Sequence, residues 1–263
     1  HGGDLMGHLP PNDFGEFPLL VKFLDAADNL SVQVHPSEQF ALENTDAYLK
    51  SEAWYIVEAE PGAVIYKGVK QGTTPEQFRA AIENNTVEEL IIPVPVKPGD
   101  VHYLPSGTCH ALGKGVLVAE VQTPSDTTFR VYDWGRTGRE LHVDQAIECI
   151  EYSPADTSQY EPHTVNERDQ TRVEALVRCE YFHIDRIEMS AGYTQELTDI
   201  EPVIWMVLEG EGEIACDAEP STPYARGETL LLPAKMSNPK LTVDSDVTLL
   251  EVKFPRGMGD LIA

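Results

Sequence analysis

Short runs of β-branched and aromatic residues recur along the chain and are separated by residues that favour tight turns. The turn residues include Pro61-Gly62, Gly99-Asp100 and Ser106-Gly107. In the first half, the runs predict strands at residues 19–24, 30–34, 53–57, 63–66, 101–104 and 116–121. Strands this frequent, with few helices between them, are typical of antiparallel sandwiches and barrels. The sequence therefore predicts a mainly β protein with a few short helices.

Two segments predict helices instead. Residues 74–77 (TPEQ) place a hydroxyl at the N-cap, a proline at the first helical position and a glutamine at the third, which together form a capping box. The apolar face of this helix would consist of Phe78, Ala81 and Ile82. The second helix would bury Val143, Ala146, Ile147 and Ile150, which are spaced i, i+3, i+4 and i+7.

The second half of the chain repeats sequence features of the first. Gly99-Asp100 corresponds to Gly227-Glu228 at an offset of 128 residues, and residues 54–58 correspond to 205–209 at an offset of 151. The difference of 23 residues is close to the length of the segment that contains the first helix. This pattern predicts two β-barrels of common ancestry. We expect a first barrel at residues 1–151 with a helical insertion at about 69–92, a polar linker at 152–170, and a second barrel at 171–263.

The chain is strongly acidic, with 44 Asp and Glu against 19 Lys and Arg and a net charge of −25. This charge argues against nucleic acid and against an anionic membrane as partners. No apolar run is long enough to span a membrane. Exposed charges are screened beyond about 8 Å at physiological ionic strength. An anionic small molecule would therefore need only a local cluster of Lys or Arg.

The four cysteines, Cys109, Cys149, Cys179 and Cys216, lie in separate stretches without a CxxC spacing. In a chain of this size they predict free thiols rather than a disulfide framework. Because free thiols persist in a reducing compartment, we expect a cytoplasmic protein.

Four side chains in the first half could form a metal site. In Gln33-Val34-His35, strand alternation points Gln33 and His35 to the same face. Glu52 directly precedes an expected strand, and His110 follows another strand and its turn. Together they offer two imidazoles, a carboxylate and an amide oxygen, a donor set that suits Zn²⁺ with one position left open.

The second half lacks the ionisable members of this set. At the corresponding positions, Glu52 is replaced by Val203 and His110 by Asn238. The scaffold residues persist in both halves, whereas the candidate ligands do not. We therefore expect a second barrel without metal ligands.

Four segments resemble a known enzyme family. They are FPLLVKFLDA at residues 17–26, LSVQVHP at 30–36, PSGTCHA at 105–111 and SDTTFRVYDW at 125–134. They resemble type I mannose-6-phosphate isomerases, also called phosphomannose isomerases, in their short bacterial form, and the similarity covers essentially the whole chain. The resemblance implies two cupin-like double-stranded β-barrels (jelly-rolls) and interconversion of mannose 6-phosphate and fructose 6-phosphate. It also implies one zinc ion per chain, held by Gln33, His35, Glu52 and His110.

The same resemblance implies roles for five further residues. The family's essential arginine corresponds to Arg130, which cannot lose its proton and would act as an electrostatic clamp for an enediolate. Lys22 and Ser31 would line the substrate pocket. Glu120 and Lys50 are both candidates for proton transfer, and the sequence does not decide between them.

The expected partner is thus a small sugar phosphate, and the protein is expected to be a monomer or a weak homodimer. Two alternatives stay open from the sequence. One is a non-catalytic sugar-binding or regulatory cupin. The other is an iron dioxygenase on the same barrel, which the presence of Gln33 fits less well because such sites favour two histidines and one carboxylate.

Overall fold

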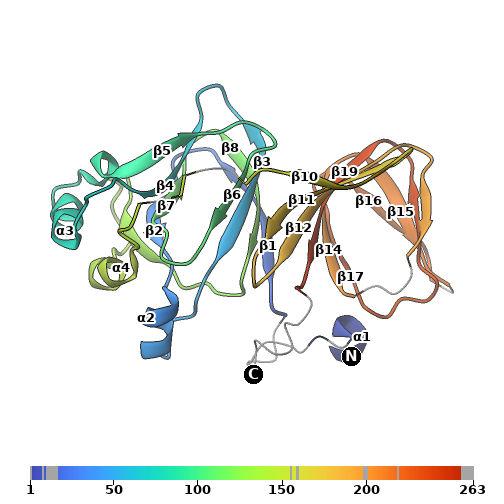
Figure 1. The fold of residues 1–263 in the computed structure, drawn as a ribbon, viewed down its shortest axis with the longest axis horizontal. Helices are drawn as coiled ribbons and strands as arrows, with labels where there is room; N and C mark the ends of the chain where they lie inside the picture. The colour runs from blue at the N-terminus through green and yellow to red at the C-terminus, as the bar shows by residue number, and fades with distance from the viewer. Residues whose placement is uncertain are drawn as a thin grey trace. The chain divides into compact units, whose positions relative to one another are not determined.

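The computed structural model describes residues 2–7, 9, 17–154, 156–157, 160–197, 201–217 and 219–255. It is mainly β with a few short helices (Figure 1), as expected. The chain forms two compact units: Leu19–Tyr160, and His1–Pro18 together with Glu161–Ala263. Among the described helices, none is long and apolar enough to cross a membrane.

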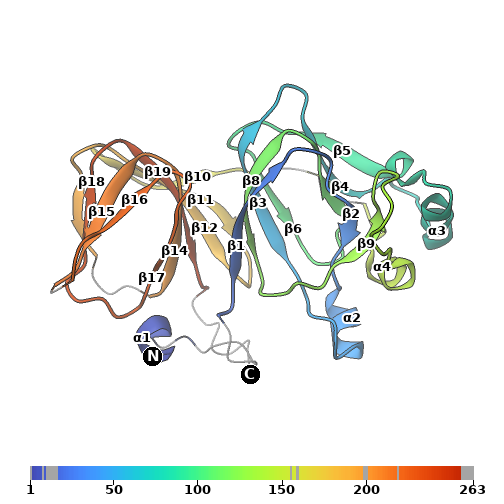
Figure 2. The same cartoon turned by 180° about the vertical axis from the view of Figure 1, so that it is seen from behind.

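The unit Leu19–Tyr160 contains two antiparallel sheets. The four-stranded sheet has the order β1 (Leu20–Ala26), β8 (Val116–Gln122), β3 (Glu52–Ala59) and β6 (Val101–Leu104). The five-stranded sheet has the order β5 (Ile91–Pro95), β4 (Val64–Val69), β7 (His110–Leu112), β2 (Val32–Val34) and β9 (Phe129–Tyr132). Figure 2 shows β1 alongside β8, to which it is paired.

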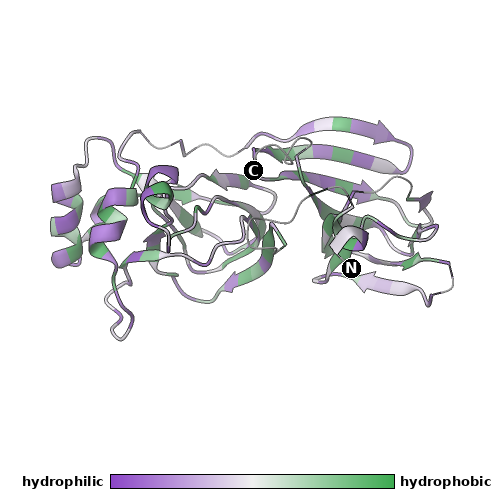
Figure 3. Cartoon of the chain, turned by 90° about the horizontal axis from the view of Figure 1, so that it is seen from below, coloured by the Kyte–Doolittle hydropathy of each residue, from purple (hydrophilic) through white to green (hydrophobic). Residues whose placement is uncertain are grey.

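A hydrophobic core lies between these two sheets. It includes Trp54 and Val118 from the four-stranded sheet and Ile65 and Leu112 from the five-stranded sheet. Hydrophilic and hydrophobic residues alternate along the strands, as Figure 3 shows. Because Glu52 has the same parity as Trp54 on β3, its side chain also points inward. Polar groups can therefore gather inside the unit at the end of β3 where Glu52 lies.

Short helices cover the outer face of the five-stranded sheet. They are α3 (Pro75–Glu83) and α4 (Val143–Cys149), while α2 (Glu38–Glu43) follows β2 and the 3-10 helix Val87–Glu89 follows α3. The predicted capping box is confirmed: the Gln77 amide N–H donates to Thr74 Oγ1 at 3.3 Å, and the Thr74 amide N–H donates to Gln77 Oε1 at 2.9 Å. The predicted apolar face of α3 is buried and packs with α4 residues and with Val32 and Val34.

The other unit also contains two antiparallel sheets. The six-stranded sheet has the order β10 (His163–Arg168), β11 (Thr171–Arg178), β12 (His183–Met189), β19 (Val247–Lys253), β14 (Val203–Glu209) and β17 (Thr229–Leu232). The four-stranded sheet has the order β13 (Thr194–Glu196), β18 (Lys240–Val243), β15 (Glu211–Ala215) and β16 (Thr222–Ala225). Helix α1 (Gly2–Met6) belongs to this unit, because the Ala234 and Lys235 amides donate to the carbonyls of Leu5 and Asp4.

The two units share one strand order. The order β12-β19-β14-β17 matches β1-β8-β3-β6, and β16-β15-β18-β13 matches β5-β4-β7-β2. A side-chain pair also recurs: Trp54 Nε1 donates to Glu120 Oε2 at 3.0 Å, and Trp205 Nε1 donates to Glu251 Oε2 at 2.9 Å. This correspondence agrees with the repeated sequence motifs.

The segment expected as a linker, residues 152–170, contains strand β10. The six residues of β10 are all exposed, so the strand has no apolar face that a sequence pattern could reveal. The preceding stretch is bonded to the first unit instead, through Glu151 N to Gly107 O at 2.9 Å and Tyr160 N to Val101 O at 2.7 Å. The expected helical insertion, about 69–92, contains α3 and the 3-10 helix between β4 and β5.

Candidate active site

Three ligand-type side chains converge inside the unit Leu19–Tyr160. Glu52 is the first residue of β3, His110 is the first residue of β7, and His35 directly follows β2. One potential ligand atom from each lies within 4.8 Å of the others, and all three residues are at most 1% exposed. Across the described residues, this is the one group of three or more His, Cys, Asp or Glu side chains that could hold a metal ion.

Main-chain carbonyls fix both imidazole rings. His35 Nδ1 lies 3.0 Å from the Thr127 carbonyl oxygen, and His110 Nδ1 lies 2.8 Å from the Thr108 carbonyl oxygen. Because a carbonyl oxygen only accepts hydrogen bonds, each Nδ1 carries the proton. Each Nε2 therefore presents a lone pair, and these nitrogens lie 3.4 Å (His35) and 3.1 Å (His110) from the Glu52 carboxylate oxygens.

Three of these buried atoms lack a hydrogen-bond partner in the described part of the chain. They are His35 Nε2 and both carboxylate oxygens of Glu52. Burial of unpaired polar atoms is costly, and lone pairs that face one another repel. A divalent cation among them would satisfy all three atoms, and orientation of each histidine by a second hydrogen bond is typical of metal ligands. The residues present thus fit a metal ion.

The protonation states of His35 and Glu52 suit a bound metal ion. Burial lowers the pKa of His35 to about 4, so its imidazole is neutral near pH 7. Burial acts to raise the pKa of Glu52, whereas positive charge and hydrogen-bond donation from His110 and His35, when these rings are protonated, hold it well below its usual value. With neutral rings, a bound cation would supply that positive charge instead. A neutral imidazole and an ionised carboxylate are the forms that coordinate metals.

Gln33, the fourth expected ligand, lies opposite His110 in the β2–β7 pairing. Its Nε2 is 3.3 Å from His110 Nε2, to which it can donate. A half turn of the amide would present Oε1 to the same region instead. Its role as a ligand stays a prediction.

A pocket of about 220 Å³ opens beside the His35–Glu52–His110 cluster. It is lined by Leu24, Leu30, Ser31, Gln33, Trp54, His110, Ala111, Leu112, Glu120, Arg130 and Arg139. Four of the expected residues are therefore brought together with His110, namely Ser31, Gln33, Glu120 and Arg130. Arg130 is held in place by Nε donation to Ser31 Oγ and Nη1 donation to the Glu140 carbonyl, both at 3.1 Å.

The two expected lysines are not among the residues that line this pocket. Lys22 donates to Glu120 Oε1 at 2.9 Å and to the Gln122 side chain. Buried Lys50 lies 3.4 Å from Glu52 Oε2. Lys22 therefore contacts Glu120, which lines the pocket, and Lys50 contacts Glu52 of the His35–Glu52–His110 cluster.

Besides the apolar lining residues, sequence reasoning missed two residues that bring hydrogen-bond donors to the pocket. Trp54 packs edge-on against the His110 ring, with centroids 5.4 Å apart, and donates to Glu120. Arg139 lines the pocket and is anchored by Nε donation to Asp133 Oδ2 at 2.8 Å. The clustering of Arg130 and Arg139 in so acidic a chain is a sequence signal that could have identified the second arginine.

Comparisons with family models, with known sequences and with solved structures all identify the same family. A family model described as "Phosphomannose isomerase type I, catalytic domain" matches residues 4–62. Mannose-6-phosphate isomerase ManA of Bacillus subtilis (strain 168) is 38% identical over 250 residues, which cover 92% of this chain and 76% of that protein.

Solved structures share the fold. The crystal structure of a mannose 6-phosphate isomerase from Bacillus subtilis superposes with a TM-score of 0.83 and 31% identity, over 96% of this chain and 79% of that one. A zinc-bound mannose 6-phosphate isomerase superposes with a TM-score of 0.70 and 18% identity, over 96% and 82% of the two chains, which is a likeness of fold. The identity to the Bacillus protein, over nine-tenths of the sequence, shows that this chain belongs to the type I mannose-6-phosphate isomerase family.

Proposed function

We propose that the protein is an aldose–ketose isomerase that interconverts mannose 6-phosphate and fructose 6-phosphate. The observation that carries this proposal is the buried His35–Glu52–His110 cluster, which borders a pocket that also contains Arg130 and Glu120. The name of the ManA relative supports the same reaction and substrate.

The proposed cofactor is one zinc ion per chain, held by Gln33, His35, Glu52 and His110. Two imidazoles with oxygen ligands and an open position are typical of catalytic zinc sites. When bound, the ion supplies a positive charge that stabilises negative charge developing on substrate oxygens. The chain's own contribution is to orient both imidazoles through the carbonyls of Thr127 and Thr108, so that each Nε2 faces the Glu52 carboxylate.

Isomerisation requires ring opening, removal of a C–H proton next to the carbonyl, and return of that proton to the neighbouring carbon through an enediolate. Arg130 would stabilise the enediolate charge, because a guanidinium stays protonated and presents a rigid array of donors. Ser31 orients Arg130 by accepting from Nε. Lys22 would add positive charge for the phosphate.

Glu120 and Lys50 are the two groups proposed to move the proton. Glu120 borders the pocket, and its carboxylate accepts from Lys22 and Trp54, which fix its position. Lys50 is buried against Glu52, a proposed zinc ligand. Of the two, Glu120 lies where a substrate in the pocket would touch it.

We further propose that each unit is a cupin-type barrel and that only the first is catalytic. Val203 occupies the position that corresponds to Glu52. In support of the proposal, it belongs to an apolar cluster with Trp205 and Leu232.

We also propose a cytoplasmic enzyme that acts as a monomer or weak homodimer. The free thiols of Cys109 and Cys149, both buried, are consistent with a reducing compartment.

The test is a coupled assay of mannose 6-phosphate turnover, run beside elemental analysis of the same preparation. We expect turnover and bound zinc to be lost together in chelator and to return together when zinc is added. Binding of mannose 6-phosphate without turnover, in protein that holds zinc, would contradict the isomerase and indicate a sugar-binding cupin.

A further inference from the structure

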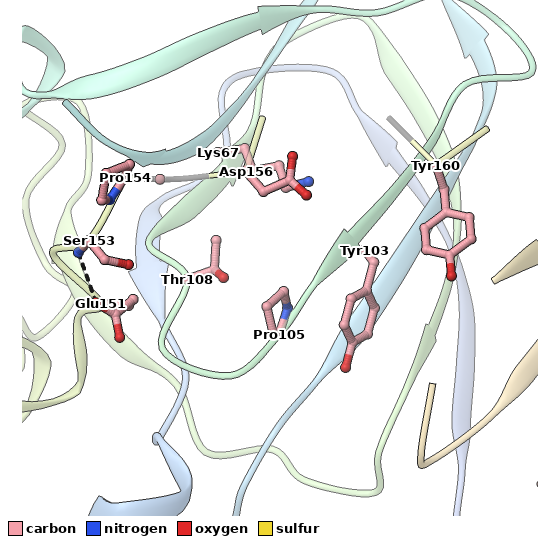
Figure 4. A pocket seen from close by; sticks show the side chains of 10 residues that line it. Lys67, Tyr103, Pro105, Thr108, Glu151, Ser153, Pro154, Asp156 and Tyr160 are labelled. Carbon is pink, nitrogen blue, oxygen red and sulfur yellow. Dashed lines mark hydrogen bonds between the residues drawn. The ribbon is translucent and has the colours of Figure 1, made fainter. Parts of the chain in front are cut away.

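The unit Leu19–Tyr160 contains a second pocket that the proposed function does not use. It has a volume of about 280 Å³ and is lined by Lys67, Gly68, Tyr103, Pro105, Thr108, Glu151, Ser153, Pro154, Asp156 and Tyr160 (Figure 4). None of these residues lines the pocket that contains Arg130. The two pockets are therefore separate sites.

Main-chain hydrogen bonds hold the wall of this second pocket in place. The Glu151 amide donates to the Gly107 carbonyl at 2.9 Å, and the Tyr160 amide donates to the Val101 carbonyl at 2.7 Å. The Ser153 amide donates to Glu151 Oε1 at 2.8 Å. The described residues between 151 and 160 are thus fastened to β6 and to the turn before β7 at both ends.

The lining combines flat apolar surfaces with hydroxyl and carboxylate groups. In Figure 4, the rings of Tyr103 and Tyr160 lie across the pocket from Ser153 and Glu151, and Thr108 lies between them. Tyrosine offers an apolar ring and a polar tip, while the serine and threonine hydroxyls both donate and accept. A ligand that matches this surface has an apolar C–H face and several hydroxyl groups.

The charges of the lining disfavour an anionic ligand. Two carboxylates, Glu151 and Asp156, face one ammonium, Lys67, whose charge interacts with that of Asp156. A phosphate ester would therefore meet a net negative wall and be repelled. Ligand pockets usually have volumes of about 300–1,000 Å³, so this one suits a single small ring.

We propose that this pocket is a second carbohydrate site, which binds an uncharged monosaccharide of the hexose class. The site lies behind one of the metal-site histidines. Thr108 lines it and accepts from His110 Nδ1, and Lys67 is paired with His110 between β4 and β7. A sugar bound there would contact the residue that orients His110, without entering the substrate pocket.

The experiment is saturation-transfer-difference NMR of the full chain with D-mannose, D-fructose and D-glucose as uncharged probes. Ser153→Trp should block the pocket, and since Ser153 is exposed the substitution should leave the fold intact. Ser221→Trp, at an exposed position of the other unit, is the matched control. Arg130→Ala alters the substrate pocket alone and tests whether the signal comes from there.

We expect at least one of the three sugars to bind the wild-type chain with a dissociation constant on the order of 1 mM, equivalent to about −4 kcal/mol. Ser153→Trp should abolish the signal, whereas Ser221→Trp and Arg130→Ala should retain it. Turnover of mannose 6-phosphate by Ser153→Trp should stay at the wild-type level, which shows that this variant is folded and separates the site from the proposed function.

Three results would overturn the proposal. The first is the absence of any sugar signal with the wild-type chain at tens of millimolar sugar, roughly tenfold above the expected constant. The second is a full signal in Ser153→Trp. The third is loss of the signal in Arg130→Ala, which would assign sugar binding to the substrate pocket instead.

Discussion

His35 and His110 reach the same point from different strands because each ring is tied to a main-chain carbonyl. The acceptors belong to Thr127 and Thr108, and the threonine side chains take no part in these two bonds. Substitution of either threonine would therefore leave the acceptor in place. The ring orientation depends on the backbone path of two loops, and a sequence pattern does not reveal that dependence.

The cluster predicts the outcome of removing one ligand. His110→Ala should lose bound zinc and turnover while the unit stays folded, because the remaining atoms no longer surround the ion. Asn238→Ala, at the corresponding position of the second half, is the matched control and should keep both. Elemental analysis, circular dichroism and a turnover assay of each purified variant check this. A full equivalent of zinc in His110→Ala would remove that residue from the ligand set.

Arg130 allows a separate test of catalysis against binding. If its charge acts mainly as the enediolate forms, Arg130→Ala should lower kcat by about 10² to 10³ and change KM much less. Arg130→Lys keeps the charge but loses the planar array of donors, so it should restore only part of the rate. Steady-state kinetics, with the zinc content of each variant measured, distinguishes a role of Arg130 in catalysis from a role in binding. An unchanged kcat with a raised KM would make Arg130 a phosphate anchor.

At the level of elements, the two units repeat one interaction between equivalent strands. A tryptophan on β3 or β14 donates to a glutamate on β8 or β19, and a lysine also contacts each glutamate. The pair exists in both units, although among the described residues only the unit Leu19–Tyr160 contains a cluster of His, Cys, Asp or Glu side chains that could hold a metal ion. The pair is therefore part of the shared scaffold. The copy at Glu120 borders a pocket that also contains His110.

This repetition provides an internal control for Glu120. Glu120→Gln and Glu251→Gln should each cost on the order of 1–3 kcal/mol in the free energy of unfolding, because each weakens a charged hydrogen bond that is buried at Glu120 and half-buried at Glu251. Only Glu120→Gln should also lower kcat, by about 10² to 10⁴ if the carboxylate moves the proton. Urea unfolding and a turnover assay measure the two effects. Equal kcat values in the two variants would leave Lys50 as the candidate.

The elements that sequence predicts best are those specified by local interactions. The capping box at Thr74 sets the start of α3, and the alternation at Gln33 and His35 sets which side chains face the metal site. Strand β10 escapes prediction because all of its residues are exposed. Trp54 is missed because its place in the pocket depends on contacts with His110 and Glu120, which are far away in sequence, so spacing carries no signal for it. Arg139 is different, because it lies close to Arg130 and Asp133 in sequence.

At the scale of the whole molecule, the net charge of −25 opposes compaction. Raising the ionic strength from about 0.01 M to about 0.15 M shortens the Debye length from roughly 30 Å to roughly 8 Å. Repulsion among the excess carboxylates then weakens, so the free energy of unfolding should rise. Urea unfolding in low and moderate NaCl, with zinc saturation equal in both, measures the change. A fall in stability over this range would mean that exposed ion pairs, such as Arg79–Asp144, outweigh the repulsion.

The contacts of α1 affect the order in which parts of the chain fold during synthesis. Leu5 and Asp4 accept hydrogen bonds from Ala234 and Lys235, so the segment that contains Asp4 and Leu5 is completed by residues made more than two hundred positions later. All the strands of the unit Leu19–Tyr160 emerge from the ribosome before any strand of the other unit. Domains generally fold as units while synthesis continues. The unit that carries His35, Glu52 and His110 can therefore fold, and bind the proposed metal ion, on the nascent chain before the partners of Asp4 and Leu5 have been made.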